Sequence, residues 1–306
     1  MSVNKITKFT TKFNEFEAGR TNFTKMEQND RSNGQLVGYV RYLSPETGEE
    51  IHLNIQCPFF KMITYGIPTL GQYYENDKAR CFVKVPLDTS DPAIQEFVVK
   101  MQELDEILGG DEFKSENFGK KASKYTYSPI IREVEDDDGN KKTSYMKIKF
   151  KTSYPEGEMQ TIFYPVDEND NTVVEVGEDG KSRAKVLDVT SVTDATQYLR
   201  YMSEFRPIIR AIKVWGHNPK STKNPEYGLV FKMEKVQIRP QQGGNTAYKS
   251  YYSADNNAFL SDDDEEILMG GKASGDDSDS EEEVVAKPKA KTKGKSKAKT
   301  PPKVVD

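Results

Sequence analysis

The chain is poor in the residue types on which many functional sites depend. Its 306 residues include two cysteines, Cys57 and Cys81, and two histidines, His52 and His217. These four residues do not have the spacing of a zinc site, and two cysteines cannot build a disulfide framework. We therefore expect buried thiols in a reducing, intracellular compartment.

Long apolar runs are absent as well. No stretch approaches the roughly 18 to 20 apolar residues that cross a bilayer. The N-terminus, MSVNKITKFTTKFNEF, lacks the apolar core of a secretory signal. We expect a soluble protein that does not bind membranes.

Catalytic signatures are also missing. The sequence contains no phosphate-binding loop, dinucleotide-binding glycine motif, nucleophile elbow or zinc-protease motif. A lone histidine is more often a satisfied surface or core residue than a catalytic base. The carboxylate runs at 135–138 and 262–266 are typical of solvated turns and tails. We therefore expect a protein that is not an enzyme and needs no cofactor or metal.

Charge is concentrated in the last 46 residues. The segment 261–283 holds 11 Asp or Glu and one Lys, and the segment 284–306 holds eight Lys and one acid. Neither has enough apolar surface to offset the entropy of ordering it, which predicts a disordered tail. The lysines can bind polyanions, whereas the carboxylates can imitate one and compete for a basic groove of the same molecule.

The other 260 residues are almost neutral, with 35 basic and 37 acidic residues. A uniformly basic nucleic-acid binder is excluded, so a polyanion site has to arise from local clustering. Residues 1–35 are polar and carry Phe9, Phe13, Phe16 and Phe23. We interpret them as an N-terminal arm anchored on the core by these rings, with stacking on bases as the alternative.

Alternation of apolar and polar residues predicts mainly β structure between 36 and 240. Strands are expected at 36–43, 51–60, 59–67, 79–87, 124–134, 143–152, 159–166, 171–177, 206–216 and 228–240. Capping residues predict a helix over 92–108, ended by two glycines, and a second helix is expected over 193–205. Too few helices separate the strands for a parallel α/β sheet, so we expect a β-barrel elaborated with one or two helices. Residues 241–260 are expected to link this core to the tail.

Cationic and aromatic residues alternate in several of these strands. Single-strand binding requires cations for phosphates and rings on which bases stack. In 143–152 the alternation turns Tyr145 and three lysines to one face, and the segment 199–239 holds nine basic residues, three acids and the sole tryptophan. The alternative to a binding site is that the tryptophan is a core residue and that the lysines form an ordinary solvent-exposed face of the sheet. The candidate binding residues are Tyr39, Arg41, Tyr125, Tyr127, Tyr145, Lys147, Lys149, Lys151, Arg206, Arg210, Lys213, Trp215 and Lys232.

The order of four segments resembles a known family. KYTYSPIIRE, YMKIKFKT, RPIIRAIKVWG and YGLVFKMEKVQIRP follow one another as in the single-stranded-DNA-binding proteins of nucleocytoplasmic large DNA viruses. The resemblance spans about 36–240 and implies an OB-fold. It further implies sequence-independent binding of single-stranded DNA in viral replication, recombination or repair. The expected locations are a cytoplasmic viral factory, the nucleus or the virion.

Partners follow from the same interpretation. Single-stranded DNA is the expected ligand, RNA or duplex DNA can bind the lysine-rich tail, and replication or repair proteins can bind the acidic tail. Phage and bacterial single-strand binders also have acidic tails, but here lysines follow the acids. The alternative is a structural core protein of the virion whose lysine-rich tail packages duplex DNA.

Overall fold

A computed structural model describes residues 10–29, 34–71, 73–136, 138–218 and 220–240. All of them belong to one compact unit, Met1–Gly244. The expectations for Phe9, for the linker 241–260 and for both halves of the tail lie outside the described residues.

The described residues form a mainly β structure, as expected. The three α-helices are α1 (Pro92–Gly109), α2 (Asp111–Phe118) and α3 (Val192–Tyr198), and short 3-10 turns lie at Phe13–Glu15, Ala18–Arg20 and Gly119–Lys124. The strands are β1 (Thr11–Lys12), β2 (Thr21–Phe23), β3 (Glu27–Asn29), β4 (Gln35–Leu43), β5 (Glu50–Ile51), β6 (Asn54–Gln56), β7 (Phe60–Lys61), β8 (Phe82–Pro86), β9 (Thr126–Ser128), β10 (Ile131–Glu135), β11 (Lys141–Phe150), β12 (Ile162–Pro165), β13 (Val174–Val176), β14 (Ser182–Ala184), β15 (Glu204–Gly216) and β16 (Glu226–Ile238).

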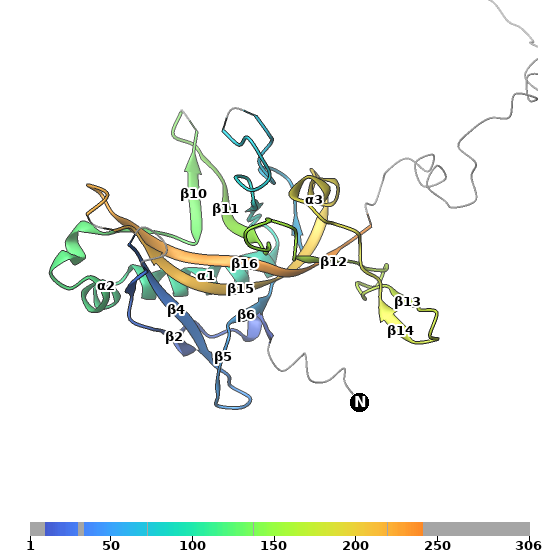
Figure 1. Ribbon diagram of the computed structural model, residues 1–306, viewed down its shortest axis with the longest axis horizontal. Helices are drawn as coiled ribbons and strands as arrows, with labels where there is room; N and C mark the ends of the chain where they lie inside the picture. Colours follow the sequence, from blue (N-terminus) through green and yellow to red (C-terminus); the bar gives the residue numbers. More distant parts are fainter. Residues whose placement is uncertain (1–9, 30–33, 72, 137, 219, 241–306) are drawn as a thin grey trace, which may run out of the picture. The chain divides into compact units, whose positions relative to one another are not determined.

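Two long antiparallel strands, β15 and β16, occupy the centre of the main sheet (Figure 1). β15 also pairs with β4, β6 and β7, whereas β16 also pairs with β9, β11 and β12. β8 and β10 join the sheet through β11, and β2, β3 and β5 join it through β4. β13 and β14 form a separate two-stranded hairpin. β4–β5, β10–β11 and β15–β16 are antiparallel pairs of strands that follow one another in the sequence.

Helix α1 covers the buried face of this sheet. It begins as the sequence predicts, because the Asp91 side chain accepts hydrogen bonds from the backbone N–H groups of Ala93 and Ile94. The ring of Phe97 packs edge-on against Phe60, and the buried side chains of the helix are Ile94, Phe97, Val98, Met101, Leu104 and Leu108. On the other face of β15 and β16, Lys213, Trp215 and Lys232 are only half-buried, and we call this the uncovered face.

The prediction of one or two helices missed α2. Gly109 and Gly110 were interpreted as terminators, but Gly110 is also the N-cap residue of α2. The second predicted helix, 193–205, is shorter than expected, because α3 ends at Tyr198 and β15 begins at Glu204. None of the described helices is both long and apolar enough to cross a membrane.

The described part of the N-terminal arm is joined to the core by strands and rings. β1 runs parallel to β6, while β2 and β3 pair with β4. Phe16 is fully buried, and the rings of Phe13 and Phe23 contact Phe97 and Phe113 edge-on at centroid distances of 6.4 and 5.5 Å. These rings are therefore packed against the core.

Candidate nucleic-acid interface

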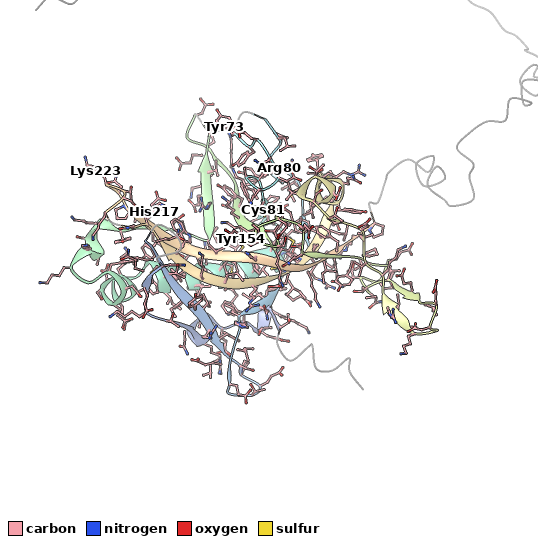
Figure 2. The ribbon with its side chains drawn as sticks, in the orientation of Figure 1. Tyr73, Arg80, Cys81, Tyr154, His217 and Lys223 are labelled. Carbon is pink, nitrogen blue, oxygen red and sulfur yellow. The ribbon has the colours of Figure 1, made fainter. Side chains whose placement is uncertain are left out.

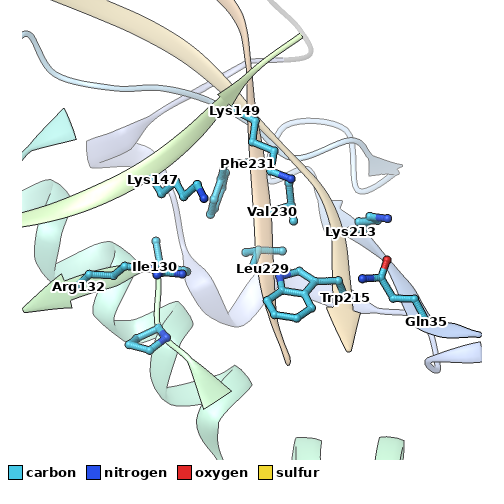
Figure 3. A pocket seen from close by; sticks show the side chains of 11 residues that line it. Gln35, Ile130, Arg132, Lys147, Lys149, Lys213, Trp215, Leu229, Val230 and Phe231 are labelled. Carbon is cyan, nitrogen blue, oxygen red and sulfur yellow. The ribbon is translucent and has the colours of Figure 1, made fainter. Parts of the chain in front are cut away.

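A concavity of about 220 Å³ lies on the uncovered face of the sheet (Figure 3). We call it the cationic concavity. Its lining consists of Gln35, Pro129, Ile130, Arg132, Lys147, Lys149, Lys213, Trp215, Leu229, Val230 and Phe231. Four of these residues are cationic and none is acidic. Three of the predicted cations and the predicted tryptophan therefore share one site.

Strand β11 contributes two cations by simple alternation. Met146, Ile148 and Phe150 are buried, which turns Lys147 and Lys149 to the other face. The ammonium group of Lys147 lies 3.8 Å from the ring centroid of Phe82, which holds it close to the sheet. The sequence predicted this orientation.

Strand β15 supplies Lys213 and Trp215 through an irregularity. Pro207, Ile209 and Ala211 are buried, so strict alternation would also bury the odd-numbered residues that follow. The register shifts between Ala211 and Lys213, however, and Val214 is the next fully buried residue. This β-bulge reverses the alternation and turns Lys213 and Trp215 to the uncovered face.

A glycine makes room for the indole. Gly228 lies opposite Trp215 on β16. A Cβ atom at this position would lie 2.9 Å from the backbone oxygen of Ser128 and 3.5 Å from the indole nitrogen. Only a residue without a side chain fits between β9 and the tryptophan.

The cations of the concavity repel one another. The pKa of Lys147 is lowered by burial and then by the charges of Lys149, Arg132 and Lys84. The pKa of Lys213 is lowered by burial and then by Lys149 and Lys232. The negative charge of a bound anion would offset both the repulsion and the cost of the lost hydration.

A row of side chains continues from the concavity across three strands. Lys149 of β11 lies opposite Lys232 of β16, which in turn lies opposite Arg210 of β15. Neighbouring strands are about 4.8 Å apart, so these cations form a continuous basic track. Arg210 lies 3.8 Å from Glu234, and its buried Nε has no hydrogen-bond partner within the described part of the chain.

The predicted cations differ in whether a carboxylate already neutralises them. Within the described residues, no carboxylate lies within ion-pair distance of any cation that lines the concavity. Lys151, by contrast, lies 2.6 Å from Glu234. Arg206 donates to the Gln237 amide oxygen at 2.7 Å, and its guanidinium lies 4.5 Å from the ring centroid of Phe59. Lys151 and Arg206 are therefore less available to phosphates than Lys149 or Lys213.

Tyr39 and Arg41 extend the same face onto β4. Tyr39 lies opposite Lys213 and is 54% exposed, so its ring is accessible beside a cation. Arg41 is half-buried, and its guanidinium approaches the ring of His52 at 3.4 Å. Burial and then the charges of Arg210 and Arg41 lower the pKa of His52.

Two of the predicted stacking residues are core residues, and that prediction is corrected. Tyr125 is 5% exposed and stacks on Phe118 at a centroid distance of 3.8 Å. The hydroxyl of Tyr127 donates to Asp105 at 2.6 Å, and burial together with this carboxylate raises its pKa far above the ordinary value. Helices α1 and α2 cover both rings, and the sequence alternation did not reveal that cover.

The ring of Tyr145 is neither exposed, as Tyr39 is, nor part of the core, as Tyr125 is. Its ring is partly buried, with the Tyr65 ring at a centroid distance of 5.0 Å and the Lys84 ammonium group at 5.0 Å. It lies opposite Arg132 on β10, beside the concavity. One part of its ring is therefore occupied by protein neighbours.

Sequence reasoning missed Arg132 and Gln35. Arg132 was not a candidate, because the sequence did not reveal that β10 places it opposite Tyr145 of β11. Gln35 is the first residue of β4 and carries no charge or ring, so no sequence signal identified it.

No metal site is found among the described residues, where no group of three or more His, Cys, Asp or Glu side chains could hold an ion. His217 and Cys81 lie well apart in Figure 2. Cys57 is buried, and burial raises the pKa of its thiol.

No family model matches this chain, but the chain is similar to known proteins. An uncharacterised protein of Acanthamoeba polyphaga mimivirus is 22% identical over 246 residues, which are 74% of this chain and 59% of the viral protein. The chain thus spans about three fifths of that relative's length. Among solved structures, the single-stranded-DNA-binding protein gp2.5 of bacteriophage T7 is similar over 69% of this chain and all of that chain, with 12% identity and a TM-score of 0.33. The viral relative agrees with the resemblance to proteins of large DNA viruses.

Proposed function

We propose that the uncovered face of β4, β15, β16 and β11 binds single-stranded DNA without regard to sequence. One observation supports this most directly. Four cations that have no carboxylate partner among the described residues surround Trp215 and apolar side chains within a single concavity. Phosphates need the cations, and bases expose their faces to a ring only when they are not stacked in a duplex.

The proposed contacts divide into two groups. Lys147, Lys149, Lys213 and Lys232, joined by Arg132, bind phosphates. Trp215 and Tyr39 stack on bases, each worth roughly 1 to 3 kcal/mol. Arg41, Tyr145, Lys151, Arg206 and Arg210 make secondary contacts, because each already has a protein neighbour on this face.

The proposal includes the architecture and the tail. The core, 36–240, is an OB-like barrel, consistent with β15 and β16 pairing with different partners along their lengths. The arm 1–35 packs on this core, and the linker 241–260 tethers the tail. The 11 carboxylates of 261–283 compete with DNA for the basic track, and the lysines of 284–306 add nonspecific affinity. The process served is viral DNA replication, recombination or repair.

The test compares the full chain with a chain that ends at residue 260. Both are titrated with oligo-dT and with duplex DNA, and quenching of the single tryptophan, Trp215, reports binding. The shortened chain is expected to bind oligo-dT at least as tightly as the full chain and to prefer it over duplex. Loss of all binding on removal of the tail would instead favour a packaging protein.

A further inference from the structure

Two polar groups inside the cationic concavity have no hydrogen-bond partner among the described residues. Gln35 and Trp215 both line it, and Figure 3 shows their side chains next to each other. Neither the Gln35 amide nor the indole N–H makes a hydrogen bond within the described part of the chain. An amide offers one acceptor and two donors in a plane, whereas phosphate offers acceptors alone. Gln35 is therefore suited to a ligand with both donors and acceptors.

The walls beside these groups are apolar. Pro129 and Ile130 close one side, and Leu229 and Val230 of β16 close another. The volume of this open concavity, about 220 Å³, is below the roughly 300 to 1,000 Å³ of pockets that hold drug-sized ligands. A flat group with apolar faces and a polar edge fits such a space, and a stack of several such groups does not.

The cations lie around the concavity, where the sugar-phosphate backbone on either side of a bound base would pass. Lys147 and Lys149 come from β11, Arg132 from β10 and Lys213 from β15, so they surround the walls from three strands. A base held inside the concavity would place its neighbouring phosphates among these groups.

We propose that the cationic concavity is a pocket for one unstacked nucleobase of the bound strand, and that the Gln35 amide hydrogen bonds to the edge of that base. The inference rests on the proposed single-strand binding. The edges of all four bases carry a hydrogen-bond donor beside an acceptor. Rotation of the Gln35 amide by half a turn exchanges the positions of its NH₂ donor and its oxygen acceptor, so the amide can match either arrangement. Gln35 therefore requires a base at this position and accepts any of the four.

The experiment uses the full chain and an oligo-dT as short as full affinity allows, so that the strand cannot shift in register. A single abasic site is moved along this oligonucleotide. One position is expected to lower affinity by roughly five- to a hundredfold, the value of one lost base contact. Other positions are expected to cost much less.

A nonpolar thymine isostere at the sensitive position then tests the amide. The wild-type chain should bind this oligonucleotide several-fold more weakly than oligo-dT, because Gln35 is left unpaired. Gln35→Leu should bind both equally. Gln28→Leu, a change on the neighbouring strand β3 at an exposed residue outside the concavity, should behave as wild type.

The outcomes separate the two proposals. Absence of oligo-dT binding by the wild-type chain would refute the proposed function itself. Tight binding with an equal loss at every abasic position would refute the pocket alone. Equal discrimination by Gln35→Leu and wild type would refute the role of the amide while leaving the pocket in place.

Discussion

Replacing Lys147, Lys149 and Lys213 together by glutamine removes three cations from the cationic concavity. None of the three has a carboxylate partner within the described residues, so the change leaves no acid unpaired. The control replaces three exposed lysines outside the concavity, Lys120, Lys124 and Lys185, and changes the net charge equally. Any difference between the two variants therefore reports position rather than total charge.

The magnitude follows from counterion release. Each phosphate contact on a single strand contributes about 0.7 to the slope of log affinity against log salt. Loss of three contacts makes the slope shallower by about 2. Over a tenfold increase in salt, the ratio of affinities between control and variant is therefore expected to fall about a hundredfold.

Fluorescence anisotropy of labelled oligo-dT at several salt concentrations measures both slopes. The control is expected to keep the wild-type slope. Parallel lines for the two triple variants would show that the concavity is not where phosphates bind, and the assignment of the interface would fail.

Three further outcomes are expected. The pKa of Lys147 is lowered in the folded state from 10.5, by burial first, so the unfolded chain holds its proton more tightly and stability rises as pH approaches 10.5. Lys147→Met should therefore stabilise the fold at neutral pH and flatten this dependence in urea unfolding, while weakening DNA binding. Asp105 accepts hydrogen bonds from Tyr127 and from the backbone at 130 and 131, so Asp105→Ala should cost roughly 3 kcal/mol in the same assay. The pKa of His52 is lowered from 6.5 by burial and by Arg210, and a bound phosphate would raise it. DNA affinity should therefore increase as the pH is lowered through the titration of this imidazole, and His52→Gln should remove this increase in anisotropy titrations.

The strand pattern gave the orientation of some site residues correctly. Strict alternation in β11 placed Lys147 and Lys149 on the face opposite Met146 and Ile148, as the structure has them. Such a prediction depends on the side-chain period of two and needs no knowledge of distant elements.

Other features depend on long-range packing that a single strand does not reveal. The bulge before Lys213 reverses the alternation, and no residue type in that segment marks it. Tyr127 alternates like a surface residue, but Asp105 of α1 and the ring of Tyr227 enclose it. Glu234 neutralises Lys151, 83 positions earlier in the chain, because β11 and β16 are neighbours. The sequence therefore located the cluster but not its free cations.

The centre of the sheet is the part of the described chain that is synthesised last. β15 and β16 end at residue 238, yet β4, β6, β9, β11 and β12 all pair with them. Until β15 and β16 have been synthesised, the edges of the earlier strands therefore lack these hydrogen-bonding partners. Pairing over such long sequence separations is also slow. A ribosome that stalls within β16 would release a chain without the middle of its sheet, and such a chain would be prone to aggregate through the waiting edges.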